Sequence, residues 1–564
     1  MSSATPTSGT SPVRRLSLTG VLRLRRPSEI WFKPALSSVA AVAPPNLLLL
    51  ALGRLDLAMY TMAGSLCALY AHNRPYAARA RTLAWVVLGM IGGLAVALVT
   101  ASLTRDAVVL VTVGALLAAV QKALCDATRV GPPGNVVLTF ISSAALFVPQ
   151  SLGQIPGHLA LAAAAGVWAW LVGMAPAPVR PHGPERRATA QALNAAAAYA
   201  AAHGTGADED HAPARAAGYA AVQAAWQTLL ALPTTGARAA TRHALERLVV
   251  RAEVALAAPA DTDPERLRAW AHALRGAGRI PRTGDAPADT DELLGVDAEL
   301  AARPVPLRRR VGPLAPIAAR TALGCALAGY ASLALGIGRP YWALVTAAAL
   351  YQANLTLTWS RAVQRVVGNL AGVLLFAAIA PLAHLGQALL VLCCLALNFG
   401  AEALITRNYW LGSVCVTPMA LLVTEFAGYQ ATGDLMTERA VDTVVGALVG
   451  FLAAVVVTNR RAGNRVEQAV TAADRARERA ARLLAEPTPA PGALEAARRG
   501  LAVALTDLRA TADGAAGEWW GRALPQERVV LAERSGHRTL AEAVRRQAVR
   551  PDRGAGTRTE DVRP

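Results

Sequence analysis

The stretch that decides the fold runs from Gly338 to Gly372 and reads GRPYWALVTAAALYQANLTLTWSRAVQRVVGNLAG. Its first part is an apolar run of helix length that ends at Trp359. The second half of that run carries two amides, Gln352 and Asn354. An apolar run of this length predicts a helix that crosses a membrane.

A basic turn is predicted directly after this run. Arg361 and Arg365 lie one helical turn apart in it, and a new apolar run opens with Gly368 and Gly372. Two apolar runs joined by a cationic elbow predict a membrane hairpin. The positive charge indicates a protein that handles something anionic.

The rest of the chain extends this interpretation to two blocks of spans. The chain has 564 residues, of which 54% are hydrophobic, and it carries a formal net charge of +18. Apolar runs of about 20 residues cross a hydrocarbon core of about 30 Å. The predicted spans are 34–52, 55–72, 82–103, 107–124, 134–150 and 154–175 in the first block, and 312–336, 341–358, 366–382, 385–404, 408–425 and 437–458 in the second. The shortest of these are the least certain, and a total of ten or eleven spans stays open.

The loop charges predict the orientation of the spans. If the N-terminus is cytoplasmic, most loop arginines fall on the inner side. The outer loops and span edges keep only Arg54, Arg105, Arg339 and Arg439. This asymmetry follows the positive-inside rule. We therefore expect a multi-pass protein of the plasma membrane with both termini in the cytoplasm.

The fold class expected is all-α, a polytopic membrane protein with two six-helix transmembrane blocks, each followed by a helical cytoplasmic segment. The Ser/Thr/Pro-rich start of the chain is not a signal peptide. The expected parts are a basic cytoplasmic tail (1–30), a first transmembrane block (31–176), a cytoplasmic helical domain (177–311), a second transmembrane block (312–458), a C-terminal cytoplasmic helical domain (459–550) and a disordered tail (551–564).

The polar segments carry helix signals of their own. Residues 184–203 read as a helix, and Asp263 before Pro264 and Glu265 reads as the cap of the next one. The clusters at 204–213 and 282–291 are rich in Pro, Gly and Asp and predict loops. Further helices are expected at 460–485, 492–512 and 527–547.

The chain also shows a weak internal repeat. Residues 70–81 form a second basic inner turn, which precedes a helix with Gly89 and Gly93. It occupies the same place in the first block as the turn at Arg361 and Arg365 does in the second. Internal repeats are common in transporters, whose substrate sites lie at the repeat interface.

No enzyme is predicted. The chain has no GxxxxGK[ST] and no HExxH, and its histidines are scattered. The six cysteines lie in or beside apolar runs without metal-ligand spacing, so we expect small core residues and no disulfide framework. No cofactor and no metal are expected, and the basic charge comes with no nucleic-acid-binding motif.

Three passages of the second block carry a family resemblance. They are the stretch from Tyr341 to Gly372, the stretch from Arg407 to Leu422, and Glu438 to Gly446 at the opening of the last span. Together they span roughly 310–460, and this region resembles the fusaric-acid-resistance (FUSC-like) family of integral membrane transporters. The soluble segments match no family in this way.

The resemblance implies a function. Family members are regarded as exporters of aromatic or other organic acids, often as duplicated chains. The plant aluminium-activated malate transporters, which are anion channels, are distantly similar. The resemblance therefore implies organic-anion transport and leaves pump and channel open.

The candidate substrate-binding residues are cations and amides. Arg361 and Arg365 share a helix face and suit a carboxylate, although topology and anionic lipid also explain inner-surface arginines. Arg320 lies two turns inside a span, so it should face a cavity or pair with Asp442, with snorkelling as the alternative. Gln352 and Asn354 complete the substrate-binding and translocation set, and interhelical hydrogen bonding is the alternative for them.

Three intramembrane acids are candidates for proton coupling: Asp442, Glu402 and Glu425. Each has a structural alternative, namely an ion pair of Asp442 with Arg439, an ion pair of Glu402 with Arg407, and a similar end-of-helix role for Glu425.

Four glycines form small-xxx-small pairs. They are Gly368 with Gly372 and Gly446 with Gly450, and close helix packing is the role expected of both pairs.

These observations lead to one expected function and two alternatives. The expected function is secondary, proton-coupled efflux of organic anions such as aromatic carboxylic acids. The alternatives are a passive organic-anion channel and a membrane scaffold that does not transport. The partners expected are membrane lipids and a small organic anion, with a homodimer left open and nucleic acid excluded.

Overall fold

The structure is a computed structural model of the whole chain. It describes residue 16 and residues 18–24, 31–203, 212–231, 239–276, 278–282, 311–352, 354–457, 462–490, 492–516 and 526–548. These residues form helices and turns and no strand. The predicted loops at 204–213 and 282–291 lie almost entirely outside the described residues, and so does the predicted tail at 551–564.

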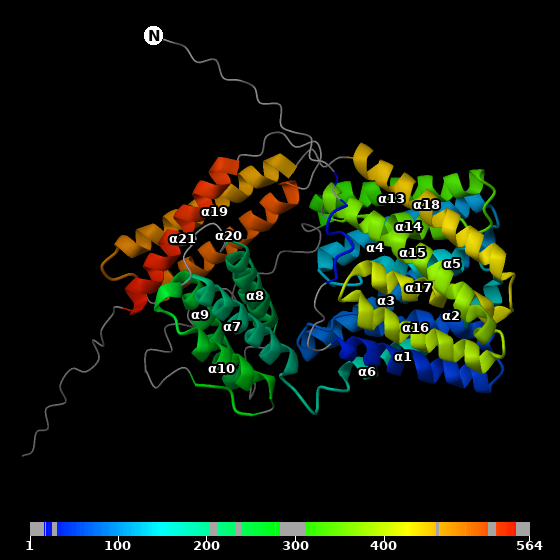
Figure 1. Ribbon diagram of the computed structural model, residues 1–564, viewed down its shortest axis with the longest axis horizontal. Coiled ribbons are helices and arrows are strands. Elements are labelled where there is room, and N and C mark those ends of the chain that lie inside the picture. The colour runs from blue at the N-terminus through cyan, green and yellow to red at the C-terminus, as the bar shows by residue number, and fades with distance from the viewer. Residues whose placement is uncertain are drawn as a thin grey trace, which may run out of the picture.

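The helices form two bodies side by side (Figure 1). One is a bundle of apolar helices that run along a common direction, and the other is built from the polar helices. The bundle end that adjoins the polar helices is called the domain-facing end below, because α6 ends there at Met174, shortly before α7 begins at Gly183. The opposite end is called the distal end.

The first half of the bundle alternates between the two ends. Its elements are α1 (Phe32–Ala51), η1 (Leu55–Leu57), α2 (Ala58–Ser65), η2 (Leu66–Leu69), α3 (Tyr76–Leu103), α4 (Ala107–Thr128), α5 (Val136–Leu146), η3 (Leu152–Gln154) and α6 (Ile155–Met174). Asp106 starts α4, because its side chain accepts from the backbone N–H of Val108 at 2.8 Å.

The second half repeats this order. Its elements are η6 (Gly312–Leu314), α13 (Ala315–Ala334), α14 (Tyr341–Leu350), α15 (Leu355–Ala383), α16 (Gln387–Ile405), α17 (Tyr409–Thr424), η7 (Glu425–Ala427) and α18 (Thr432–Val456). The two halves interlock, because α4 packs on α13 and α1 packs on α16.

Nine helices of the described chain are long and apolar enough to span a membrane. Three further apolar helices are shorter: Leu55–Leu69, Val136–Leu146 and Tyr341–Leu350. Each short helix fills the place of one predicted span. The chain is therefore an all-α polytopic membrane protein, as predicted, although three of its twelve segments are too short to cross a bilayer unaided.

The stretch from Gly338 to Gly372 folds differently from the prediction. The first helix ends at Leu350, not near 358, and α15 begins at Leu355 with Asn354 as its cap, whose side chain accepts from Leu357 N at 2.9 Å. Arg361 and Arg365 therefore lie inside a helix, and the predicted basic turn between two spans is wrong. The chain reverses at residues 351–354 instead, because Asn354 satisfies the free N–H groups of a new helix there.

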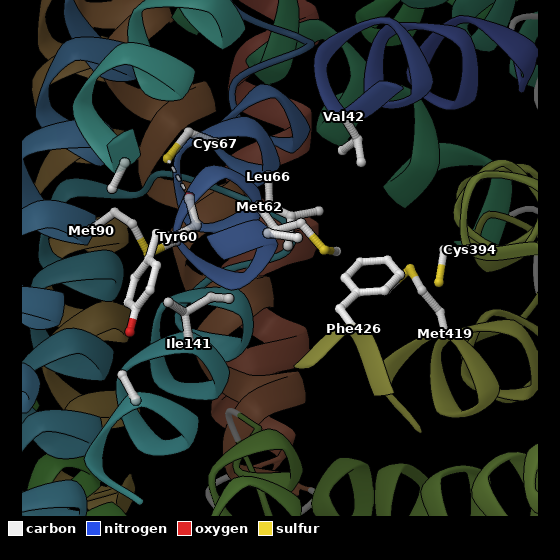
Figure 2. Packing of buried hydrophobic residues seen from close by; sticks show 14 of the residues in the cluster. Val42, Tyr60, Met62, Leu66, Cys67, Met90, Ile141, Cys394, Met419 and Phe426 are labelled. Atoms are coloured by element: carbon white, nitrogen blue, oxygen red, sulfur yellow. Dashed lines mark hydrogen bonds between the residues drawn. The ribbon is translucent and has the colours of Figure 1, made fainter. Parts of the chain in front are cut away.

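The core of the bundle joins both halves. Figure 2 shows Tyr60, Met62 and Leu66 on one side and Met419 and Phe426 on the other. All five belong to one cluster of buried apolar residues. The six cysteines are free thiols, as expected, and five of them are buried.

The polar helices form two helical groups that touch each other. The first is α7 (Gly183–His203), α8 (Ala212–Leu230), α9 (Ala239–Ala257), η4 (Pro259–Asp261) and α10 (Pro264–Arg275), and the second is α19 (Ala462–Ala485), α20 (Ala493–Ala516) and α21 (Gln526–Ala548). The cap predicted at Asp263 is present, since its side chain accepts from Glu265 N at 2.9 Å. Neither α8 nor α9 was predicted from the sequence.

A buried ion cluster joins these two groups. Arg498 Nη1 lies 2.7 Å from Glu253 Oε2, and Arg498 Nη2 lies 3.1 Å from Glu495 Oε2. Burial alone would lower the pKa of Arg498, but the carboxylates of Glu253 and Glu495 raise it above its ordinary value. Trp226 adds a hydrogen bond from Nε1 to Glu253 Oε1 at 2.6 Å. Helices that precede the second half of the bundle in the sequence therefore contact a helix that follows it.

Candidate functional site

A large cavity runs through the bundle. Its volume is about 2740 Å³, and the two halves of the bundle share its wall. At the domain-facing end it is lined by loop residues such as Arg74, Arg129 and Arg407, and at the distal end by Asp56 and Gln430. The lining therefore reaches from one end of the bundle to the other.

The charges on the cavity wall are strongly unequal. Among the described residues that line the cavity are twelve arginines or lysines and three acids. The cations are Arg23, Arg74, Lys122, Arg129, Arg187, Arg320, Arg339, Arg361, Arg365, Arg407, Arg439 and Arg465, and the acids are Asp56, Asp126 and Glu402. A cleft with apolar walls and one sign of charge concentrates ions of the opposite sign.

Arg361 and Arg365 meet one aromatic side chain in this cavity. Arg365 Nη1 donates to Tyr409 Oη at 2.8 Å, and the Arg361 guanidinium lies 3.9 Å from the centroid of the Tyr409 ring. Arg365 is 4% exposed, and its Nε has no hydrogen-bond partner. The predicted pair is therefore brought together, on α15 facing α17.

Arg439 is the functional candidate that sequence reasoning missed. It is 1% exposed, it lines the cavity, and its guanidinium lies 4.9 Å from the Trp342 ring centroid. Neither Nε nor Nη1 has a hydrogen-bond partner. The predicted ion pair between Arg439 and Asp442 is wrong. The available signal was the place of Arg439 in the passage from Glu438 to Gly446.

Arg320 has a partner that the sequence did not predict. Its Nε and Nη2 donate to the carbonyl of Val457 at 2.9 and 2.7 Å, so it caps the C-terminal end of α18. The predicted pairing with Asp442 is wrong, because Arg320 lies near the start of α13 and Asp442 lies nearer the other end of the bundle. Arg320 also lines the cavity.

The three candidate acids have different surroundings. Glu402 lines the cavity, and the predicted ion pair with Arg407 is not formed. Asp442 Oδ1 accepts from Ser332 Oγ at 2.6 Å, and its Oδ2 has no partner. Glu425 lies 3.1 Å from His384 Nε2. Of the three acids, Glu402 is the one among the cavity-lining residues.

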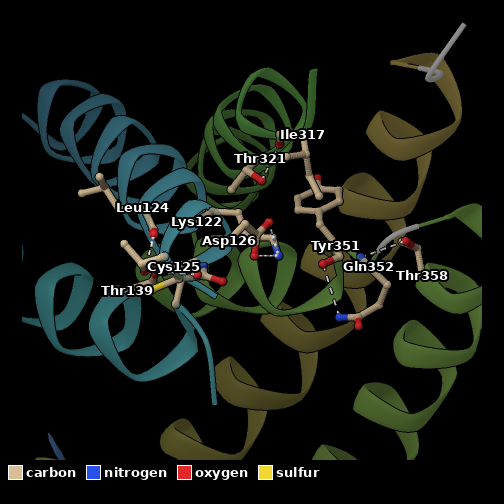
Figure 3. A network of polar contacts seen from close by, with 12 residues as sticks. Lys122, Leu124, Cys125, Asp126, Thr139, Ile317, Thr321, Tyr351, Gln352 and Thr358 are labelled. Carbon is tan, nitrogen blue, oxygen red and sulfur yellow. Dashed lines mark hydrogen bonds and ion pairs between the residues drawn. The ribbon is translucent and has the colours of Figure 1, made fainter. Parts of the chain in front are cut away.

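The two amides also differ. Gln352 lines the cavity and lies beside Tyr351 and Thr358, as Figure 3 shows, and its backbone N–H donates to Thr358 Oγ1 at 3.2 Å. Asn354 caps α15 and is not among the lining residues.

The glycine pairs lie at close helix contacts. A Cβ built on Gly368 would lie 2.6 Å from Ser413 Cβ, and one on Gly372 would lie 2.7 Å from Thr417 Cβ, so α15 lies close against α17. A Cβ on Gly446 would lie 2.5 Å from the carbonyl oxygen of Ala343. A Cβ on Gly450 would lie 3.0 Å from Ala347 Cβ on the same helix, α14. These contacts agree with the packing role expected of both pairs.

Residues 70–81 in the first half, the counterpart of the stretch at Arg361 and Arg365, also contribute to the cavity. Arg74 donates to the carbonyls of Thr128 and Arg129 at 3.2 and 2.5 Å, so it caps α4 as Arg320 caps α18. Arg79 Nη2 donates to His72 Nδ1 at 3.0 Å. Burial, with the charge of Arg79 beside it, lowers the pKa of His72 to about 4, so the imidazole is neutral and can accept this bond.

Comparison with known proteins assigns part of the chain. Residues 326–453 match the family described as "Fusaric acid resistance protein-like". A stretch of 141 residues is 34% identical to an uncharacterized membrane protein, YvaC of Bacillus subtilis (strain 168). This stretch makes up 25% of the present chain and 22% of YvaC. The match thus spans about a fifth of the relative's length. No solved structure matches the chain. The resemblance inferred from the sequence is confirmed over the matched residues.

Proposed function

Since residues 326–453 are of the fusaric acid resistance protein-like family, within a multi-pass membrane protein, we propose that this chain carries organic anions across the membrane. The observation that carries the proposal is the cavity wall, whose described residues include twelve cations and three acids. Such a wall admits carboxylates and repels cations. Aromatic carboxylic acids are the proposed substrates, because Tyr409 lies beside the guanidinium groups of Arg361 and Arg365 on the cavity wall.

The proposed direction is export from the cytoplasm. The positive-inside rule assigns the domain-facing end to the cytoplasm, with both chain termini on that side of the plasma membrane. Arg361, Arg365, Gln352 and Arg320 would meet the substrate from this end.

Proton coupling is proposed to use Glu402. It shares the cavity with the substrate, whereas the carboxylates of Asp442 and Glu425 already accept from Ser332 and pair with His384. Protonation of Glu402 would alternate with anion occupancy of the same space.

A passive channel is the second candidate. It is favoured by the cavity itself, whose lining residues come from both ends of the bundle. Uncoupled currents across a planar bilayer would identify a channel, whereas efflux that stops when the proton gradient is collapsed would identify an exporter.

The test of the proposed function is efflux from proteoliposomes that contain the purified full chain. Benzoate should leave faster than from protein-free liposomes, and Arg361→Gln/Arg365→Gln should slow it at least tenfold. Arg81→Gln is the control, because Arg81 lies on an exposed part of α3 outside the cavity lining. Equal efflux from wild type, the double variant and empty liposomes would contradict the proposal.

A further inference from the structure

Two buried arginines lie deep in the bundle on neighbouring helices. Arg365 is the eleventh residue of α15, which places it about 15 Å from the domain-facing start of that helix. Arg439 is the eighth residue of α18, about 10 Å from its distal start. Helix α15 packs directly on α18, and both arginines lie on the wall of the same cavity.

Both arginines keep hydrogen-bond donors that no described residue satisfies. Arg365 Nε has no partner, and neither have Nε and Nη1 of Arg439. Both residues line the cavity. A buried guanidinium without partners is unfavourable in a low-dielectric bundle, so donors left free in this way need a counter-ion.

The neighbouring acids do not supply this counter-ion. Glu438, next in sequence to Arg439, lies 3.6 Å from Arg339. Asp442 accepts from Ser332 on α13, and no ion pair of the described residues joins it to Arg439. The protein thus places two cations at the cavity, and neither Glu438 nor Asp442 forms an ion pair with them among the described residues.

We infer that Arg365 and Arg439 form one binding site for an oxyanion that takes hydrogen bonds from both guanidinium groups. The ligand carries at least two oxygens on one centre, as a carboxylate or an inorganic phosphate does, because the free donors come from two separate side chains. Tyr409, which lines the same cavity and accepts from Arg365, offers an aromatic wall for the remainder of the ligand. This inference rests on the proposed function and assigns its central binding site.

The test is ligand binding by the purified full chain in detergent, with benzoate, inorganic phosphate and chloride as probes. Arg439→Gln should weaken benzoate binding at least tenfold, and Arg81→Gln should leave it unchanged. Chloride should bind at least tenfold more weakly than benzoate, because one spherical ion does not offer two oxygens. Arg439→Lys should fall between wild type and Arg439→Gln.

A melting measurement separates a binding role from a structural one. Without added anion, Arg439→Gln should melt no lower than wild type, because the cost of burying a charge without an ion-pair partner outweighs its contact with the Trp342 ring. Benzoate should raise the melting temperature of wild type but not that of Arg439→Gln. Wild-type benzoate affinity in Arg439→Gln would overturn the site alone, whereas a folded wild type that neither binds nor moves any probe would overturn the proposed function as well.

A second inference concerns residues 18–24, which precede the bundle. Three side chains of the second half bind consecutive carbonyls of this segment. Val21 O accepts from Gln364 Nε2 at 2.9 Å and from Asn408 Nδ2 at 3.0 Å. Leu22 O accepts from Trp410 Nε1 at 3.2 Å, and Arg23 O accepts from Asn408 Nδ2 at 3.1 Å.

The segment lies on the wall of the same cavity. Thr19, Gly20, Val21 and Arg23 line it, and the Val21 side chain is 9% exposed. Gln364 precedes Arg365 in the sequence and Asn408 precedes Tyr409, so the bound segment sits beside the pair that receives the substrate in the proposed function.

We infer that residues 18–24 act as a restraint on the domain-facing mouth of the cavity. Release of the segment should widen the mouth and speed anion movement. This effect differs from that of Arg439, because it concerns access to the cavity and leaves the binding site itself intact.

The test uses Gln364→Met/Trp410→Phe, which removes two of the side-chain donors to the segment and adds no charge to the cavity wall. Asn408 stays in place, so its oxygen still caps α17. Benzoate efflux should rise at least threefold, with benzoate affinity within twofold of wild type. Val21→Glu should act in the same way, because a charged side chain cannot stay buried at that position.

Gln387→Glu is the matched control, since it adds a carboxylate to an exposed residue at the distal end. It should leave efflux unchanged. Equal or slower efflux in both folded mouth variants would overturn the restraint. Benzoate efflux by wild type in the same experiment would leave the proposed function standing.

Discussion

Substitution of Glu402 by Gln should separate anion movement from proton coupling. Glu402 lines the cavity, while Asp442 accepts from Ser332 and Glu425 lies 3.1 Å from His384. A carboxylate that exchanges protons during transport needs access to water, and Glu402 is the acid of these three that meets this requirement. The Gln side chain has nearly the same size but cannot take up a proton.

The magnitude follows from counting one proton per anion. A difference of one pH unit across the membrane corresponds to about 1.4 kcal/mol, or a factor of ten in concentration. With the membrane potential held at zero, wild type should therefore build an anion ratio of about ten for each pH unit. Glu402→Gln should let the anion equilibrate to a ratio near one.

The assay is benzenesulfonate distribution in proteoliposomes with an imposed pH difference and a potassium ionophore that fixes the potential, because benzoic acid crosses a bilayer in its neutral form and would follow the pH difference without the protein. Asp442→Asn is the comparison variant, and it should keep the gradient-driven ratio if the protein folds. A tenfold ratio in Glu402→Gln, or loss of the ratio in Asp442→Asn alone, would refute the assignment of proton exchange to Glu402.

Three further outcomes are expected from the packing and the charges. Gly446→Ala should lower the free energy of unfolding by about 1–3 kcal/mol in a detergent melt, because the new Cβ lies 2.5 Å from the carbonyl oxygen of Ala343, while Gly433→Ala, with nothing within 4 Å, should not. Arg498→Met should cost about 3–5 kcal/mol, because it leaves two buried carboxylates unpaired, and Arg509→Met, in an exposed pair on the same helix, should cost less than about 1 kcal/mol; equal effects would contradict this reasoning. Burial, with the charge of Arg215 nearby, lowers the pKa of His537 to about 4, below the value of about 6.5 in an unfolded chain, so the unfolded chain takes up the proton first and stability should fall as the pH drops from 6.5 towards 4. His537→Gln should flatten this fall in a pH series of melts, and an unchanged slope would count against it.

The sequence predicted the class of fold because apolar length is a local property. Runs of about 20 apolar residues mark spans wherever they occur, and the described chain contains nine helices of that kind. The break after Leu350 was missed because the apolar run continues through Tyr351, and hydropathy does not register a cap. The signal that could have located the break was Asn354, a residue type that favours helix starts.

The site was predicted less completely because its contacts join distant residues. Arg439 and Asp442 are three residues apart, which suggests an ion pair on one helix face. The structure directs Asp442 to Ser332 on another helix and leaves Arg439 at the cavity. Contacts across hundreds of residues, such as that of Trp410 with Leu22, leave no periodic pattern in the sequence.

The measurement that tests the central claim most directly compares benzoate with benzamide, its uncharged analogue, in efflux from proteoliposomes of the full chain. The cavity wall carries twelve cations and three acids in the part of the chain that the structure describes, so selection should depend on the negative charge of the solute. Protein-dependent efflux of benzoate should exceed that of benzamide at least tenfold, and Arg361→Gln/Arg365→Gln should remove most of the difference. Equal protein-dependent efflux of the two solutes, or none of either, would contradict the account.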